Sequence, residues 1–106
     1  MDFGDALRAL RTGYRLARSG WNGKGMFIYL VPAGNYFPTT SVAKAYFGGQ
    51  LVPYKPYIAI KTVDGDVVPW LASQTDLLAE DWMALESNGQ GRALDARVAP
   101  CLPDHI

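Results

Sequence analysis

The chain has 106 residues, about half of them apolar, which predicts one folded domain and excludes wholesale disorder. Ten basic and ten acidic side chains cancel, and this balance argues against a sequence-independent binder of polymeric nucleic acid, which normally presents a strongly basic face.

The first predicted element is an amphipathic helix over residues 2–12, where apolar side chains recur at intervals of three or four. Asp2 is a suitable N-cap for it, and Gly13 stands where a C-terminal glycine belongs. A short strand is predicted over residues 14–17, and the Asn-Gly pair at 22–23 predicts a tight turn.

The middle of the chain holds a second strand followed by a long excursion. Residues 26–31 form an uninterrupted apolar run, typical of a strand that is buried on both faces, and Pro32 ends it. Prolines and glycines recur through residues 33–56, which predicts a partly ordered loop with one helical turn over residues 41–46.

The last predicted elements are a hairpin, a helix and a strand. Residues 57–63 alternate as a strand does, Asp64-Gly65 is a turn signal, and residues 66–68 return antiparallel before Pro69 closes the hairpin. A short helix over residues 73–80 precedes a final strand over 82–85.

These elements predict an α+β fold with an N-terminal amphipathic helix, a small antiparallel sheet and a short C-terminal helix before the last strand. We expect residues 1–86 to form the domain and residues 87–106 to be a flexible tail, because periodicity is lost there. Thirteen aromatic side chains are more than so small a core hides, so we expect an oligomer.

The sequence lacks the residues of a catalytic or metal site. The single histidine and single cysteine, His105 and Cys101, lie in the last six residues, and no Gly-rich phosphate loop is present. Carboxylates at 64 and 66 fit a hairpin turn, and those at 80 and 81 fit the end of a helix, better than catalysis. We therefore predict no enzyme, no metal and no cofactor.

The chain also lacks the features of an exported or membrane protein. Its acidic start does not have the basic-then-apolar layout of a signal peptide, and no apolar stretch approaches the roughly 18 residues of a membrane span. We expect a cytosolic protein that has no membrane partner.

Trp21 and Asn22 are the first candidate binding residues. An indole in a glycine-flanked turn can stack on a nucleobase, and the neighbouring amide can read a base edge or a ribose. The alternatives are a Trp21 ring that plugs the core beneath the sheet and an Asn22 that serves turn geometry.

The second candidate is the predicted helix start at Ser73, Gln74, Thr75 and Asp76, whose free N–H groups and hydroxyls suit a phosphate or a ribose. The alternative is a plain capping box, because Ser73 and Asp76 stand three residues apart.

Three motifs give the chain a resemblance to a phage and prophage family that includes the second Thoeris anti-defence protein. They run in order from Met1 to about Leu85. The motifs are Met-Asp-Phe-Gly-x-Ala-Leu at the start, Ala17-Arg18-x-Gly20-Trp21-Asn22-Gly23-Lys24-Gly25-Met26, and Asp64-Gly65 leading to Val68-Pro69-Trp70-x-Ala72-Ser73-Gln74-Thr75-Asp76-x-Leu78-Ala79-Glu80-Asp81-Trp82.

The resemblance implies an α+β homotetramer that acts as a sponge in the cytoplasm of the bacterial host. Such a protein binds cyclic ADP-ribose isomers made by the Thoeris sensor, without cleaving them, in pockets between protomers. Some relatives also bind cyclic oligonucleotides of the CBASS type at separate sites. The resemblance assigns ligand contacts to Trp21, Asn22 and the 73–76 segment.

Two other functions stay open at this stage. One is hydrolysis of the same signal with Asp76 or Glu80 as the general base, and the other is a phage module that binds a host protein through exposed aromatics.

Overall fold

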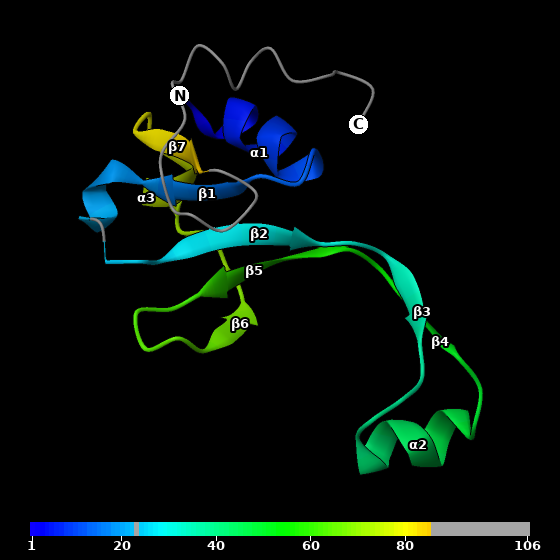
Figure 1. Cartoon of the computed structure of the whole chain (residues 1–106). Coiled ribbons are helices and arrows are strands. Elements are labelled where there is room, and N and C mark those ends of the chain that lie inside the picture. The colour runs from blue at the N-terminus through cyan, green and yellow to red at the C-terminus, as the bar shows by residue number, and fades with distance from the viewer. Residues whose placement is uncertain (23, 86–106) are drawn as a thin grey trace.

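The main sheet has five antiparallel strands in the spatial order β6-β5-β2-β1-β7 (Figure 1). The structure is a computed structural model that describes residues 1–22 and 24–85. The longest pairing joins β2 to β5, from Phe27 opposite Lys61 to Val31 opposite Tyr57. The strands of this sheet are β1 (Arg15–Arg18), β2 (Phe27–Val31), β5 (Tyr57–Lys61), β6 (Val67–Pro69) and β7 (Trp82–Leu85).

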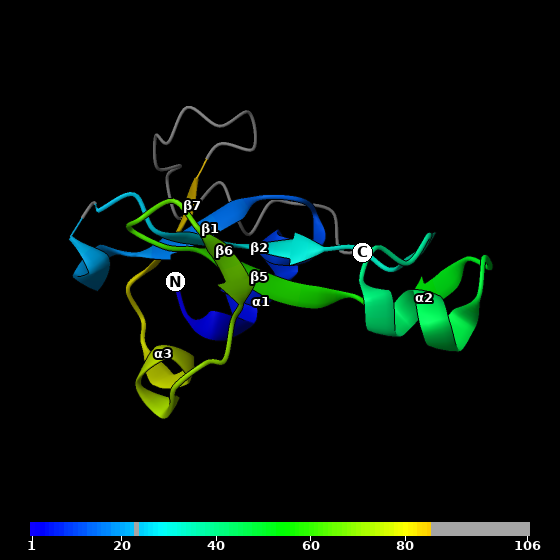
Figure 2. The ribbon, with the colours of Figure 1, turned by 90° about the horizontal axis from the view of Figure 1, so that it is seen from below.

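Two helices lie on the same side of this sheet (Figure 2). Helix α1 (Phe3–Arg11) begins at Asp2, whose carboxylate accepts the Asp5 amide at 2.9 Å, and the chain leaves it through Gly13 at a φ of +100°. Helix α3 (Gln74–Leu78) begins at Ser73. The predicted caps are therefore confirmed: Asp2 and Ser73 fix where the two helices start, and Gly13 follows the end of α1.

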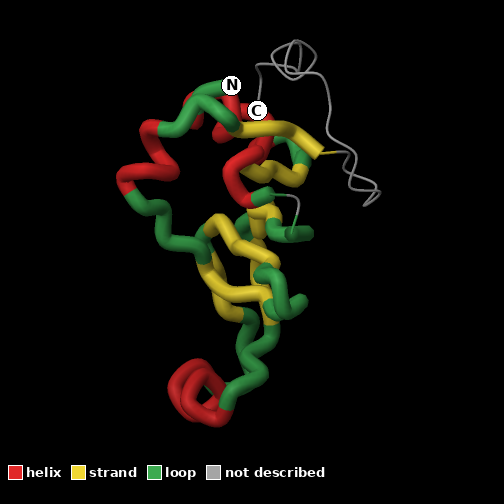
Figure 3. Tube along the Cα trace, turned by 90° about the vertical axis from the view of Figure 1, so that its left-hand side faces the viewer, coloured by secondary structure: helices red, strands yellow, loops and turns green. Residues whose placement is uncertain are grey.

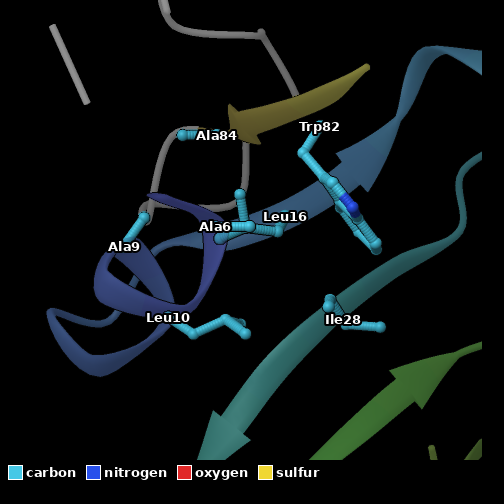
Figure 4. Close-up of a cluster of buried hydrophobic side chains, with 7 residues drawn as sticks. All are labelled: Ala6, Ala9, Leu10, Leu16, Ile28, Trp82 and Ala84. Carbon is cyan, nitrogen blue, oxygen red and sulfur yellow. The ribbon is translucent and has the colours of Figure 1, made fainter. Parts of the chain in front are cut away.

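The core lies between α1 and the sheet (Figure 4). Trp82 is its largest fully buried side chain, and its ring packs against Phe3, Trp21 and Trp70 at centroid distances of 5.4, 5.5 and 6.0 Å. Such edge-to-face packing is the arrangement that aromatic quadrupoles favour. The residues of the buried cluster are Ala6, Ala9, Leu10, Leu16, Ile28, Trp82 and Ala84.

Beyond the main sheet, the chain forms a projecting arm (Figures 1 and 3). Its stem is a second sheet that pairs β3 (Gly34–Tyr36) with β4 (Val52–Tyr54), and its tip is α2 (Ser41–Phe47). No residue of α2 is buried, and Val42 and Tyr46 are 81% and 82% exposed. The arm therefore adds little to the core.

The α+β class, the antiparallel sheet, the N-terminal helix and the helix before the last strand are all confirmed. The predicted burial of residues 26–31 on both faces is wrong, since only Ile28 is buried in β2. Helices cover one face of the sheet, so alternate side chains of the strand stay partly exposed. The predicted flexible tail, residues 87–106, lies outside the described residues.

Three further details correct the sequence-based boundaries. Residues 33–56 hold paired strands where a partly ordered loop was predicted, although the helical turn over 41–46 is confirmed as α2. Pro69 ends the hairpin as the last residue of β6, opposite Ala59, so the strand reaches one residue beyond the predicted 66–68, on an edge strand where a missing N–H is tolerated. Helix α3 ends at Leu78, two residues before the predicted end at residue 80.

None of the helices in the described part of the chain is both long enough and apolar enough to cross a bilayer.

Leu16→Ala should lower the free energy of unfolding by about 2–5 kcal/mol, because it leaves a cavity in the fully buried cluster. Urea unfolding followed by fluorescence measures this change. Val42→Ala, at an exposed position of α2, is the control and should change stability by less than about 0.5 kcal/mol. Equal effects of the two substitutions would contradict the assignment of the core.

Candidate functional site

Trp21 and Asn22 lie at the end of β1, where the chain makes a short 3₁₀ helix, η1 (Ser19–Trp21). Asn22 follows with a left-handed backbone, φ 59° and ψ 34°, and its N–H donates to the Ser19 carbonyl at 3.0 Å. Asn is among the few residues that tolerate this conformation. Asn22 thus has the turn conformation that was predicted and is exposed, whereas Gly23 of the predicted pair lies outside the described residues.

Trp21 is partly buried and packs against the buried cluster, which is the alternative that the sequence left open for this residue. One portion packs edge-on against Trp82, with an interplanar angle of 79°. Trp21 nevertheless keeps more solvent exposure than the fully buried Trp82. The contact with Trp82 therefore orients the ring, while Trp21 as a residue is only partly buried.

The start of α3 forms the capping box that was the alternative to a binding role. Ser73 Oγ accepts the Asp76 N–H at 3.0 Å, and Asp76 Oδ2 accepts the Ser73 N–H at 3.4 Å. Gln74 and Thr75 are exposed at the same turn. Helix capping thus engages Ser73 and Asp76, while the two side chains between them, Gln74 and Thr75, are exposed to solvent.

Trp82 brings these two segments together. Its ring packs on Trp21, and its indole N–H donates to the Asp76 carbonyl at 3.0 Å. We call the region formed by Arg18–Asn22 and Ser73–Trp82 the junction. The structure therefore places the predicted residues of both segments at one region of the fold.

Arg18 is the principal residue of the junction that sequence reasoning missed. Its Nε donates to Asp81 at 2.8 Å and its Nη1 donates to Asp76 at 2.9 Å. Asp81 also accepts the Gly20 N–H at 2.9 Å and the Ser19 hydroxyl at 3.2 Å. One guanidinium thus ties the end of β1 to α3, through Asp76, and to the loop before β7, through Asp81.

These contacts keep the junction charged. The hydrogen bond from Arg18 lowers the pKa of the Asp81 carboxyl to about 2, against the opposing effect of burial, and the same bond raises the pKa of Arg18. Asp81 is therefore ionised at neutral pH and occupied by its partners. Both carboxylate oxygens of Asp76 are likewise engaged, one by Arg18 and one by Ser73.

The chemistry that the junction offers is recognition by stacking and hydrogen bonding. Trp21 supplies a ring, Asn22 and Gln74 supply amides, and Thr75 supplies a hydroxyl. Across residues 1–22 and 24–85, no group of three or more His, Cys, Asp or Glu side chains is placed to hold a metal ion.

Comparison with known proteins gives a consistent picture of the family. The family model described as the Thoeris anti-defense 2-like domain matches residues 1–85. A protein named Thoeris anti-defense 2, from Bacillus phage SP01, is 40% identical to this chain over 82 residues, which is 77% of this chain and 91% of that protein.

Asp81→Asn should lower the free energy of unfolding at pH 7 by about 1–2 kcal/mol, because the amide loses the ion pair with Arg18. The folded pKa of Asp81, about 2, lies below the ordinary value of 3.8. Its stabilisation is therefore fully present above the ordinary value and is lost as pH falls toward the folded pKa.

Urea unfolding of wild type and variant at pH 7, 4, 3 and 2 tests this linkage. The difference between the two proteins should shrink between about pH 4 and pH 2. A difference that stays constant across this range would contradict it. Asp64→Asn, in the exposed hairpin, is the matched control and should leave stability at pH 7 within about 0.5 kcal/mol.

Proposed function

The chain belongs to the Thoeris anti-defense 2-like family, and we propose that it is a phage anti-defence sponge that binds a cyclic ADP-ribose-type immune signal without cleaving it. By holding the signal in the cytoplasm of the bacterial host, the protein would keep it from the effector it activates. Cyclic oligonucleotides of the CBASS type are a second ligand class within the same proposal.

The observation that carries this proposal is the junction. Its Trp21 ring is fixed by Trp82, and the exposed polar side chains of Asn22, Gln74 and Thr75 come from segments that Trp82 and Arg18 hold together. A binding group that is already ordered loses little entropy when the ligand arrives. The junction is therefore suited to tight capture.

In the proposed complex, an adenine ring stacks on Trp21, an interaction worth about 1–3 kcal/mol in single-strand systems. The amides of Asn22 and Gln74 and the hydroxyl of Thr75 bond to the base edge and the ribose. Ser73 and Asp76 keep the capping box, and a ribose hydroxyl donates to Asp76, because each carboxylate oxygen accepts more than one hydrogen bond. A phosphate placed against Asp76 would be repelled.

Assembly as a homotetramer is part of the proposal. A pocket closed by a neighbouring protomer would slow ligand release, and dissociation is where most differences in affinity arise. We assign the ligand-sequestering role to residues 1–86 and assign no role in binding to residues 87–106.

Two other functions compete with the sponge. Hydrolysis of the signal would need Asp76 or Glu80 as a general base, and the ion pair of Asp76 with Arg18 disfavours the first of these. A module that binds a host protein is favoured by one observation, the exposed apolar side chains of α2. The experiment below separates all three functions.

Purified protein is mixed with a panel of cyclic ADP-ribose isomers and CBASS-type cyclic oligonucleotides, and free ligand is measured by chromatography before and after heat denaturation. A sponge depletes one compound and returns it intact on denaturation. Depletion with new products means an enzyme. If no compound is depleted, the sponge proposal fails and the host-protein module remains.

Trp21→Ala should weaken the capture of the depleted ligand by about tenfold or more, because the stacking surface is lost. Trp21→Phe keeps an aromatic face and should recover part of the affinity. Tyr46→Ala, at the exposed tip of the arm, is the matched aromatic control and should bind as wild type does. If Trp21→Ala and wild type capture the ligand equally well, the ligand does not bind at the junction.

A further inference from the structure

A second aromatic site lies at the base of the arm, where β3 and β4 leave the main sheet (Figure 1). A cavity of about 350 Å³ is found there, within the range of about 300–1,000 Å³ that is usual for small-molecule sites. We call it the arm pocket, and it shares no residue with the junction. The side chains that define its chemistry are Tyr36, Phe37, Tyr54, Tyr57, Lys55 and Thr39.

The backbone of the arm is shaped to hold one wall of this pocket. A Cβ at Gly34 would lie 2.8 Å from the hydroxyl oxygen of Tyr36 and 2.9 Å from its Cζ, closer than real Cβ contacts. The Tyr36 ring therefore folds back over Gly34, and its hydroxyl donates to the Pro32 carbonyl at 3.4 Å. Tyr54 packs against this ring at a centroid distance of 5.6 Å.

The aromatic rings of the arm pocket are only partly buried by the rest of the protein. Tyr36, Tyr54 and Tyr57 are 45%, 44% and 47% exposed, and Phe37 is 68% exposed. Large apolar rings that gather around one cavity and stay in contact with water offer a surface for a ligand ring to cover. The fold alone does not account for their exposure.

Charge selects among the ligands that such rings bind. An all-aromatic cage favours a cation, but Lys55 is among the lining residues, and its positive charge repels one. An anion without an aromatic ring would be attracted by the charge of Lys55 but would make no stacking contact with the four rings. The chemistry that uses both features is a flat ring that carries a negative charge.

We propose that the arm pocket is a binding site for a flat aromatic ring bearing an anionic group, such as a nucleoside monophosphate or an aromatic carboxylate. The ring stacks among the tyrosines, and the anion meets Lys55 and the hydroxyl of Thr39. This proposal does not depend on the proposed function, because no side chain of the junction takes part.

Calorimetric titration of the full chain with adenosine monophosphate, 1-naphthoate, adenosine and inorganic phosphate tests it. At least one of the first two should bind, adenosine should bind at least about fivefold more weakly than its monophosphate, and phosphate should not bind. Binding of the monophosphate alone identifies a nucleotide site, and binding of the naphthoate alone identifies a site for aromatic acids. Failure of both ring-bearing anions to bind overturns the proposal.

Three variants place the binding. Tyr54→Ala should weaken probe binding about tenfold. Lys55→Gln should lower the affinity for the charged probes to about the affinity for adenosine. Gly34→Ala should also weaken it, because the new methyl group displaces Tyr36. All three change exposed or strand positions of the arm, so each should keep the thermal midpoint of the core within a few degrees.

Trp21→Ala separates this site from the junction. It should leave probe binding unchanged here, whatever it does to capture of a cyclic signal. If probe binding is lost in Trp21→Ala and kept in Tyr54→Ala, the ligand sits at the junction and the arm-pocket proposal is wrong.

Discussion

The fold depends on the burial of one indole. Trp82 is 1% exposed, and burying so large a ring contributes strongly to stability only if its N–H finds an acceptor. The Asp76 carbonyl is that acceptor, so this fully buried residue of β7 also fixes the position of α3. The same ring orients Trp21 and Phe3 by edge contacts. Hydrophobic burial and one hydrogen bond thereby set the geometry of the region we assign to the ligand.

The ion pairs of Arg18 act on this geometry rather than on stability alone. Partly exposed salt bridges are individually weak, yet a guanidinium that meets two carboxylates restricts three segments at once. Asp81 adds the Gly20 amide and the Ser19 hydroxyl, so the turn before Trp21 cannot shift without breaking several contacts. Two donors of Arg18, on Nε and Nη1, are therefore used within the protein to hold Asp81 and Asp76.

Local signals in the sequence were enough to predict much of the fold. The cap at Asp2, the turn at Asn22, the hairpin at Asp64-Gly65 and the box at Ser73 each depend on residues within four positions of one another. The missed features are those that distant residues create. Arg18 lies 58 and 63 residues from its two partners, and nothing in their local patterns pairs them. The candidate residues at the junction were therefore found while the interaction that holds them together was not.

The pairing of β3 with β4 in the arm was also not predicted from the sequence. Its strands, Gly34–Tyr36 and Val52–Tyr54, contain Gly, Asn and Pro, which are depleted in strands, so composition favours a loop. Their pairing is supported by what the side chains do afterwards: Val52 is buried, and Tyr36 lies against Tyr54 across the two strands. Because α2 buries nothing, substitutions in the arm can reshape its pocket without loss of the core around Trp82. The protein thus separates the junction, which is tied to its core, from an arm whose side chains can change without disturbing that core.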